Sequence, residues 1–266
     1  FTPAPTVNAG PDASVCSNNA NITLAGAFTG ATGAIWSGGT GTYNPNNTTL
    51  NAVYTPSAAE RIAGTVTLTL STVGNGSCNA VGDAVTFTIT PSPTVNAGVD
   101  RTVCANNVAV TLSGSSTVAT GGMWSGGNGT FDPSTTNMSA IYTASAAEIA
   151  NGSVTLTLTT TGIGNCVAVT DQMTINFTAA PVVNAGAPVS LCANNAQVSL
   201  SGSVTGATGG VWSGGTGTYS PNNSTLTATY TPTAGEIAGG TLTLTLTSTG
   251  NGTCNPVQSS RVINFT

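Results

Sequence analysis

The chain has 266 residues, a formal net charge of −5 and only 4% charged residues. It contains 3 Lys+Arg and no His, and the three basic residues are all arginine. Nucleic acids and anionic membrane surfaces are bound by clustered cations, so these partners are excluded. General acid/base catalysis lacks its usual His and Lys, and no segment approaches the ~18 apolar residues of a membrane span. We therefore expect no enzyme, no nucleic-acid partner and no membrane insertion in this segment.

An 88-residue period organises the sequence, because cysteines, a tryptophan, a tyrosine and a glutamate recur at that spacing without insertion or deletion. Such self-similarity indicates one structural unit that is used three times. We predict repeats at 3–90, 91–178 and 179–266. Residues 1–2 match the last two residues of each repeat, so we interpret them as the end of a preceding repeat in a longer array. Prolines at the joints favour stiff connections.

Strands are predicted wherever apolar and polar residues alternate. In Thr65–Leu70 the alternation places Val66, Leu68 and Leu70 on one face and threonines on the other. In chain order, the strands expected in the first repeat are Ala13–Cys16, Asn21–Ala25, Ala34–Ser37, Asn51–Thr55, Thr65–Leu70 and Ala84–Thr90. About seven short strands separated by Gly, Asn and Pro clusters are typical of an immunoglobulin-like sandwich. The predicted fold is all-β: a tandem array of three immunoglobulin-like β-sandwich domains of 88 residues each.

One helical turn interrupts the strands of each repeat. Ser57 and Glu60 have the spacing of a capping box, in which hydroxyl and carboxylate each bind a free backbone N–H. Gly64 follows at the distance of a C-terminal cap, and the pattern recurs in the other repeats. This structural role is favoured for the shared glutamate over a catalytic or metal-binding one.

Acidic residues leave two alternative sites open. In a glycosidase-like enzyme Glu148 would need a second carboxylate, and Asp132 and Asp171 are the nearest by sequence. Asp12 and Asp100 occupy matching positions that we place near the joints, where calcium could bind, although calcium needs several oxygen ligands. The third repeat has proline at this position, and an Asx turn is the alternative role. No cofactor is expected apart from this weak calcium candidate.

Each repeat carries two cysteines, 62 residues apart. One even pair per repeat predicts a disulfide within the repeat and an oxidising compartment. The expected pairs are Cys16–Cys78, Cys104–Cys166 and Cys192–Cys254. Two thiolates without His make a poor zinc site, and bridges between chains are a further alternative. We expect the bridge to tie an N-terminal strand to a loop near one end of the sandwich, unlike an antibody domain.

Aromatic and threonine residues each allow two interpretations. Trp36, Trp124 and Trp212 precede a glycine turn and are predicted to lie in the core. If their indoles were exposed, they would instead form a platform that stacks on glycans. The threonine rows are interpreted as solvent-facing strand residues, with an ice-binding face as the alternative.

The recurrent pattern W-S-G-G-x-G-T-[Y/F] … Y-T-x-[S/T]-x-x-E … G-x-[V/L]-T-L-T-L covers all three repeats. It resembles the Ig-like or PKD-like repeats of giant surface proteins from gliding, type IX-secreting bacteria. The resemblance is carried in the first repeat by Trp36, Gly38, Gly39, Tyr54, Glu60 and the strand around Val66–Leu70. It implies a stalk, adhesin or filament and supplies no catalytic residues.

We therefore expect a secreted or cell-surface structural element, forming a stiff stalk or a surface filament. Its expected partners are neighbouring copies of itself or further repeats of the same chain. The alternative function is a carbohydrate-binding adhesive module that contacts surface glycans through the tryptophan and tyrosine strands.

Overall fold

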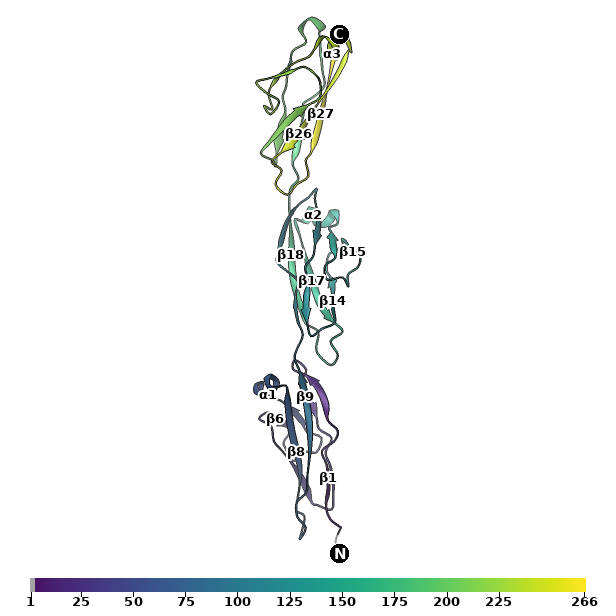
Figure 1. Ribbon diagram of the computed structural model, residues 1–266, viewed down its shortest axis with the longest axis vertical. Coiled ribbons are helices and arrows are strands. Elements are labelled where there is room, and N and C mark those ends of the chain that lie inside the picture. The colour runs from purple at the N-terminus through teal and green to yellow at the C-terminus, as the bar shows by residue number, and fades with distance from the viewer. Residues whose placement is uncertain (1–2) are drawn as a thin grey trace.

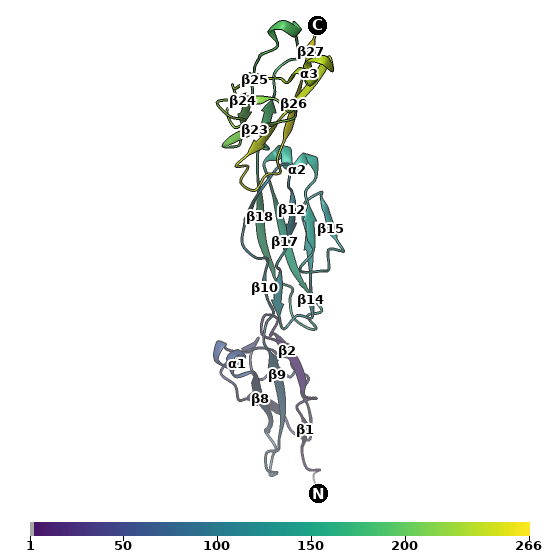
Figure 2. The ribbon, with the colours of Figure 1, turned by 45° about the horizontal axis from the view of Figure 1, so that its top comes forward.

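The computed structural model describes residues 3–266 and shows three β-sandwich repeats that follow one another along a rod. The two chain ends lie at opposite ends of this rod (Figure 1). A view turned by 45° shows the same succession, with a narrow waist between neighbouring repeats (Figure 2). The expectation for residues 1–2 concerns a part of the chain outside the described range.

The three repeats contain corresponding elements. Repeat 1 consists of β1 (Thr6–Asn8), β2 (Ala13–Cys16), β3 (Ile22–Thr23), β4 (Ala27–Thr29), β5 (Gly33–Ser37), β6 (Thr42–Asn44), β7 (Val53–Thr55), α1 (Ala58–Ala63), β8 (Thr65–Val73) and β9 (Gly82–Thr90). Repeat 2 consists of β10 (Thr94–Asn96), β11 (Arg101–Cys104), β12 (Ala109–Thr111), β13 (Ser115–Thr117), β14 (Gly121–Ser125), β15 (Thr130–Asp132), β16 (Ile141–Thr143), α2 (Ala146–Asn151), β17 (Ser153–Thr161) and β18 (Thr170–Thr178). Repeat 3 consists of β19 (Val182–Asn184), β20 (Val189–Leu191), the 3-10 helix η1 (Ala193–Asn195), β21 (Val198–Ser199), β22 (Ser203–Thr205), β23 (Gly209–Ser213), β24 (Thr218–Ser220), β25 (Thr229–Thr231), α3 (Ala234–Ala238), β26 (Thr241–Thr249) and β27 (Gln258–Phe265).

Each repeat forms small sheets around a core of its own. In repeat 1 the strand order is β2-β9-β8-β5 in one sheet and β3-β7-β6 in another, while β1 pairs with β4. The alternation along β8 buries Leu68 and Leu70 completely and leaves threonines on the outer face. On that face the hydroxyls of Thr67 and Thr86 lie 3.0 Å apart across neighbouring strands. The period of two therefore builds the sandwich as predicted, one face packed and one solvated.

The first strand of the large sheet runs parallel to the last strand of the same repeat. β2 pairs with β9 in a parallel register that places Cys16 beside Thr90. β8 and β9, by contrast, are antiparallel neighbours, and the loop that joins them contains Cys78. Cys16 thus lies at the end from which the chain leaves the repeat, whereas Cys78 lies at the opposite end.

Local sequence signals predict several elements closely. The strand expected at Ala13–Cys16 is confirmed, and those expected at Asn21–Ala25 and Asn51–Thr55 are shorter, as β3 and β7. The sequence analysis does not predict β1, β4 and β6, because three residues are too few to display an alternation.

The helical turns have the predicted caps. Both hydrogen bonds of the capping box form in all three helices. Gly64 and Gly152 close the first two helices with left-handed φ angles of 78° and 83°. In repeat 3 the cap position is Gly239, and the left-handed angle of 75° is found one residue later, at Gly240.

Candidate functional site: the junctions between repeats

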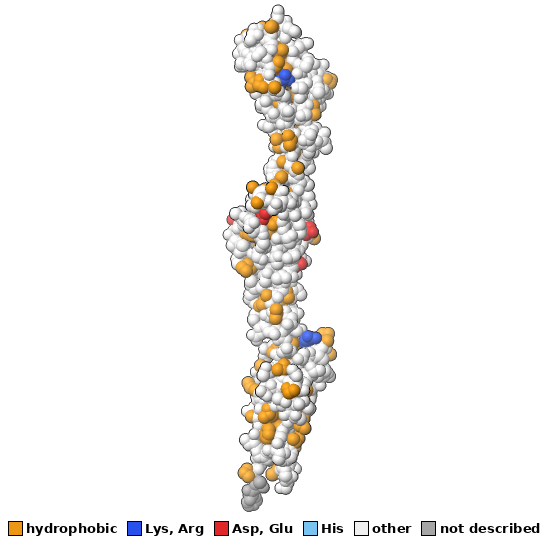
Figure 3. Space-filling view, turned by 180° about the vertical axis from the view of Figure 1, so that it is seen from behind, with side chains coloured by type: hydrophobic (Ala, Val, Ile, Leu, Met, Phe, Trp, Pro, Cys, Tyr) orange, Lys and Arg blue, Asp and Glu red, His pale blue; other side chains and the backbone are white. Residues whose placement is uncertain are grey.

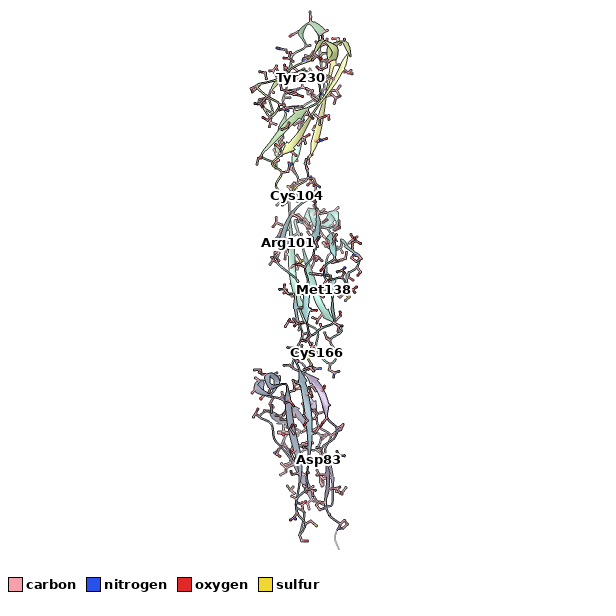
Figure 4. All side chains as sticks on the ribbon, viewed as in Figure 1. Asp83, Arg101, Cys104, Met138, Cys166 and Tyr230 are labelled. Carbon is pink, nitrogen blue, oxygen red and sulfur yellow. A yellow bond between two sulfur atoms is a disulfide. The ribbon has the colours of Figure 1, made fainter. Side chains whose placement is uncertain are left out.

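Disulfides cross the two junctions between repeats. Cys16 of repeat 1 is bonded to Cys166 of repeat 2, and Cys104 of repeat 2 to Cys254 of repeat 3. Each bridge joins residues 150 positions apart, with a Cα–Cα distance of 4.9 Å. Figure 4 places Cys166 at the waist between repeats 1 and 2 and Cys104 at the waist between repeats 2 and 3. Each bridge therefore links the exit end of one repeat to the entrance end of the next.

The expected pairs within repeats, Cys16–Cys78, Cys104–Cys166 and Cys192–Cys254, are wrong. The physical reason is the parallel pairing of β2 with β9, which carries Cys16 to the far end of the repeat from the β8–β9 loop. These ends are separated by a nine-residue strand, about 30 Å at the usual rise. Cys78 and Cys192 are free thiols within residues 3–266.

Two asparagines beside the first disulfide bind the loop of the next repeat. Asn18 Nδ2 donates to the carbonyl oxygen of Val167 at 2.8 Å, and the Val167 N–H donates back to Asn18 Oδ1 at 3.0 Å. Asn19 Nδ2 donates to the carbonyl oxygen of Asn165 at 3.1 Å. We call these two asparagines with the loop backbone that they bind the asparagine clasp. Because the clasp binds backbone atoms of the loop, it does not depend on the loop side chains.

The second junction repeats the asparagine clasp. Asn106 Nδ2 donates to the Asn255 carbonyl oxygen, and the Asn255 N–H donates to Asn106 Oδ1, both at 3.0 Å. Asn107 Nδ2 donates to the carbonyl oxygen of Thr253 at 3.0 Å. The sequence analysis missed these asparagines, although a signal exists: each N-terminal cysteine is followed by one small residue and then Asn-Asn in all three repeats.

The tryptophans occupy the core and not a glycan platform. Trp36, Trp124 and Trp212 are at most 1% exposed. The indole Nε1 of Trp36 donates to the carbonyl oxygen of Leu50 at 3.2 Å, and the other two make matching bonds. The core interpretation is confirmed, and the glycan contact proposed for these three residues is wrong because no indole face is accessible.

The two calcium candidates bind backbone of their own sandwich. Asp12 Oδ1 accepts the N–H of Thr86 at 2.7 Å, and Asp100 Oδ1 accepts that of Thr174 at 2.8 Å. Thr86 lies in the middle of β9, so the expected position of Asp12 beside the joint is wrong. These long-range bonds also differ from the Asx turn considered as the alternative. Within residues 3–266 no three acidic, cysteine or histidine side chains gather as metal ligands would.

The shared glutamate is held in a hydrogen-bond network. In repeat 2, Glu148 is 5% exposed and accepts bonds from the Tyr142 hydroxyl at 2.7 Å, the Ser145 N–H at 2.7 Å and the Asn128 N–H at 2.6 Å. Burial alone would raise the pKa of Glu148, but these bonds hold it below its ordinary value. Burial, together with the bond to Glu148, raises the pKa of Tyr142 to about 12. The predicted structural role of this glutamate is confirmed.

The carboxylates considered as catalytic partners of Glu148 serve elsewhere. Asp171 Oδ2 accepts the N–H of Ala97 at 2.8 Å, which fastens the strand β10 region to β18. Asp83 makes the equivalent bond to Ala9 in the middle of repeat 1, where Figure 4 labels it. Asp132 is exposed at the end of β15.

The outer surface offers little for charged ligands. The rear face of the rod carries only scattered acidic and basic side chains (Figure 3). Among the described residues no helix has the length and apolar character needed to cross a membrane.

No family model and no curated protein matches this sequence. Among solved structures, the chain is similar to a three-immunoglobulin-domain fragment of titin, an E-to-A mutated variant, with 11% identity, a TM-score of 0.50 and 99% of both chains covered. A mouse cadherin-23 fragment has 12% identity and a TM-score of 0.38, with 99% of both chains covered. A protocadherin gamma B2 fragment has 13% identity and a TM-score of 0.35, with 98% of this chain and 73% of that chain covered. The chain is a tandem array of three immunoglobulin-like β-sandwich domains.

Proposed function

We propose that this chain is a non-catalytic, extracellular structural element that forms a stiff segment of a cell-surface stalk or filament. The observation that carries the proposal is the position of the disulfides, which join neighbouring repeats and leave the interior of each repeat without a bridge. A bridge that only stabilised a domain could lie within it. A bridge across each junction fixes how one domain stands on the next.

The junction is held at two separate places, which is what resists bending. The polypeptide itself passes from β9 to β10 at Pro91, and the disulfide forms a second covalent connection beside it. Rotation about a single connection is easy, whereas two connections and the asparagine clasp leave little freedom. Each hydrogen bond of the clasp adds about 0.5–1.5 kcal/mol to the closed arrangement.

An extracellular location is supported by the chemistry of the bridges. Disulfides persist in oxidising compartments and are rare in reducing ones. With only 4% charged residues, the surface presents little electrostatic repulsion to neighbouring rods, which suits lateral bundling. The resemblance to repeats of giant surface proteins from gliding, type IX-secreting bacteria supports the same role, as the shaft of an adhesin or the body of a fibre.

The rod shape in solution tests this function. We would compare the native chain with Cys16→Ser/Cys104→Ser, which removes one cysteine from each bridge, by small-angle scattering and electron microscopy. The matched control is Cys78→Ser/Cys192→Ser, which removes two thiols outside the bridges. We expect straight rods for the native and control chains and a broad range of bend angles for the first variant. Freely bent native particles would overturn the proposal.

The compartment is tested separately by trapping thiols in the source cells before lysis. We expect alkylation of Cys78 and Cys192 at most, with the four bridge cysteines protected until a reductant is added. Alkylation of all six cysteines would place the protein in a reducing compartment and contradict the extracellular assignment.

A further inference from the structure

We infer that the two ends of this chain are complementary halves of the same junction, so that copies join head to tail through a disulfide between Cys192 of one copy and Cys78 of the next. The 88-residue period makes Cys192 the counterpart of Cys16 and Cys104, and Cys78 the counterpart of Cys166 and Cys254. This inference rests on the proposed rod function and names the partner, a second copy of the chain.

The exit face of repeat 3 already has the conformation found at the formed junctions. The N–H of Asn195 donates to the carbonyl oxygen of Cys192 at 2.9 Å, as Asn107 does to Cys104 at the second junction. The N–H of Ala193 donates to Thr266 at 2.9 Å, as the corresponding residues of the other repeats do to the last strand residue. The face is therefore built before a partner arrives.

The same face shows what a partner would cover. Cys16 and Cys104 are completely buried in the formed junctions, whereas Cys192 is exposed. Asn194 and Asn195 occupy the positions of the asparagine clasp, and within the described chain their side-chain amides bind no other residue. A thiol and two amides thus stand together as they do at the junctions, without the loop that they bind there.

The entrance face of repeat 1 supplies that loop. The N–H of Cys78 donates to the carbonyl oxygen of Asn75 at 3.1 Å, which matches the bond of Cys166 to Ile163 at 3.1 Å. In the formed junctions the clasp binds backbone groups of the residues on either side of the cysteine. In repeat 1 these neighbours are Ser77 and Asn79, and their backbone groups serve equally because no particular side chain is needed.

The bond forms by oxidation of two thiols. Cys192 and Cys78 lose two protons and two electrons, which a small-molecule disulfide accepts as it becomes two thiols. The exit and entrance faces differ from each other, so the contact is head to tail and leaves one free face of each kind at the ends of any oligomer. Such a heterologous contact does not need to close and extends into a filament.

The test is the linkage pattern of the purified chain, internal disulfides intact, treated with oxidised glutathione. We expect a ladder of dimers, trimers and longer species on a non-reducing gel, in which peptide mapping finds Cys192–Cys78 bonds. Cys78→Ser alone and Cys192→Ser alone should remain largely monomeric, because like faces do not fit. An equal mixture of these two variants should stop at the dimer, since only one complementary pair of thiols remains.

Specificity of the face is tested by removing the clasp. Asn194→Ala/Asn195→Ala should slow ladder formation at least several-fold, while Gln172→Ala, an exposed amide in the middle of repeat 2, should not. Random linkage, with Cys78–Cys78 and Cys192–Cys192 bonds as frequent as mixed ones, would overturn the inference, as would no linkage at all. Either result would leave the rod function intact, because that function is measured on the stiffness of single chains.

Discussion

A buried tyrosine–glutamate pair ties the helical turn of each repeat to its three-stranded sheet. In repeat 1 the hydroxyl of Tyr54 donates to Glu60 at 2.9 Å and accepts the N–H of Gly41 at 2.8 Å. Gly39 packs so closely on this hydroxyl that a Cβ at that position would overlap it, and its φ angle is 69°. The two glycines following the tryptophan motif are thus explained by the space that the pair occupies.

We predict that Glu148→Gln destabilises repeat 2 by about 1–3 kcal/mol, because an amide cannot accept all the bonds now made to the carboxylate. The measurement is the midpoint of the first urea unfolding transition. Asp132→Asn is the matched control, since it also removes one negative charge, and repeat 1 already has Asn44 there. The pKa of Glu148 is lowered in the folded chain, so the native advantage should be lost as the pH falls below the ordinary value of 4.5. A pH-independent difference between the two proteins would contradict this assignment.

All five tyrosines are expected to titrate late. Burial comes first among the causes that raise the pKa of each of them from 10.0 to about 12. A raised pKa means stabilisation that is complete below pH 10 and lost as the pH climbs towards 12. Absorbance at 295 nm should therefore stay flat around pH 10 in the native chain and rise there in urea-unfolded chain. A native titration step near pH 10 would count against the buried hydroxyls.

Residue types and spacing predict the core tryptophans and the capped glutamates well, because both roles are decided by neighbours close in sequence. They predict the aspartates poorly. The bond of Asp12 to Thr86 joins residues 74 positions apart, and only the register of β2 against β9 brings them together. A carboxylate that accepts a distant backbone N–H has no local sequence mark that separates it from a metal ligand.

The direction of one strand decides what the cysteines do. Alternation of apolar and polar residues predicts β2 and β9 as strands but is the same whether they pair parallel or antiparallel. An antiparallel β2 would bring Cys16 to the end that holds Cys78, and the predicted bridge within the repeat would form. The parallel register instead sends the cysteine to the junction. The fold class could therefore be predicted from the sequence, and the connectivity of the site could not.

At the level of elements, we predict that Asn18→Ala makes the Cys16–Cys166 bridge easier to reduce. The substitution removes both hydrogen bonds to Val167, about 1–3 kcal/mol, which corresponds to roughly a tenfold shift in the equilibrium with dithiothreitol. Mass spectrometry of alkylated peptides measures the two bridges separately in the same sample. Cys104–Cys254 keeps its own clasp and serves as the internal control. Equal sensitivity of both bridges would show that the clasp does not support the junction.

For the whole rod, the bridges shorten the covalent path along which tension travels. A pull on residues 3 and 266 passes through 14 residues (3–16), the first bridge and 101 residues (166–266), so the 149 residues between the bridged cysteines bear none of the final extension. The second bridge offers an alternative path of the same length, through residues 3–104 and 254–266. Domains that open under load would therefore release little chain, which suits a stalk that must hold its length.

Single-molecule stretching between the chain ends tests this consequence. At about 3.3–3.6 Å per extended residue, the bridged path of 115 residues reaches about 400 Å, whereas an unbridged chain of 264 residues reaches about 900 Å. Because the two paths are equally long, Cys16→Ser alone and Cys104→Ser alone should both keep the short limit. Only Cys16→Ser/Cys104→Ser should reach the long one, while Cys78→Ser/Cys192→Ser should match the native chain. A long limit in either single variant would mean that the remaining bridge does not span the repeats as placed here.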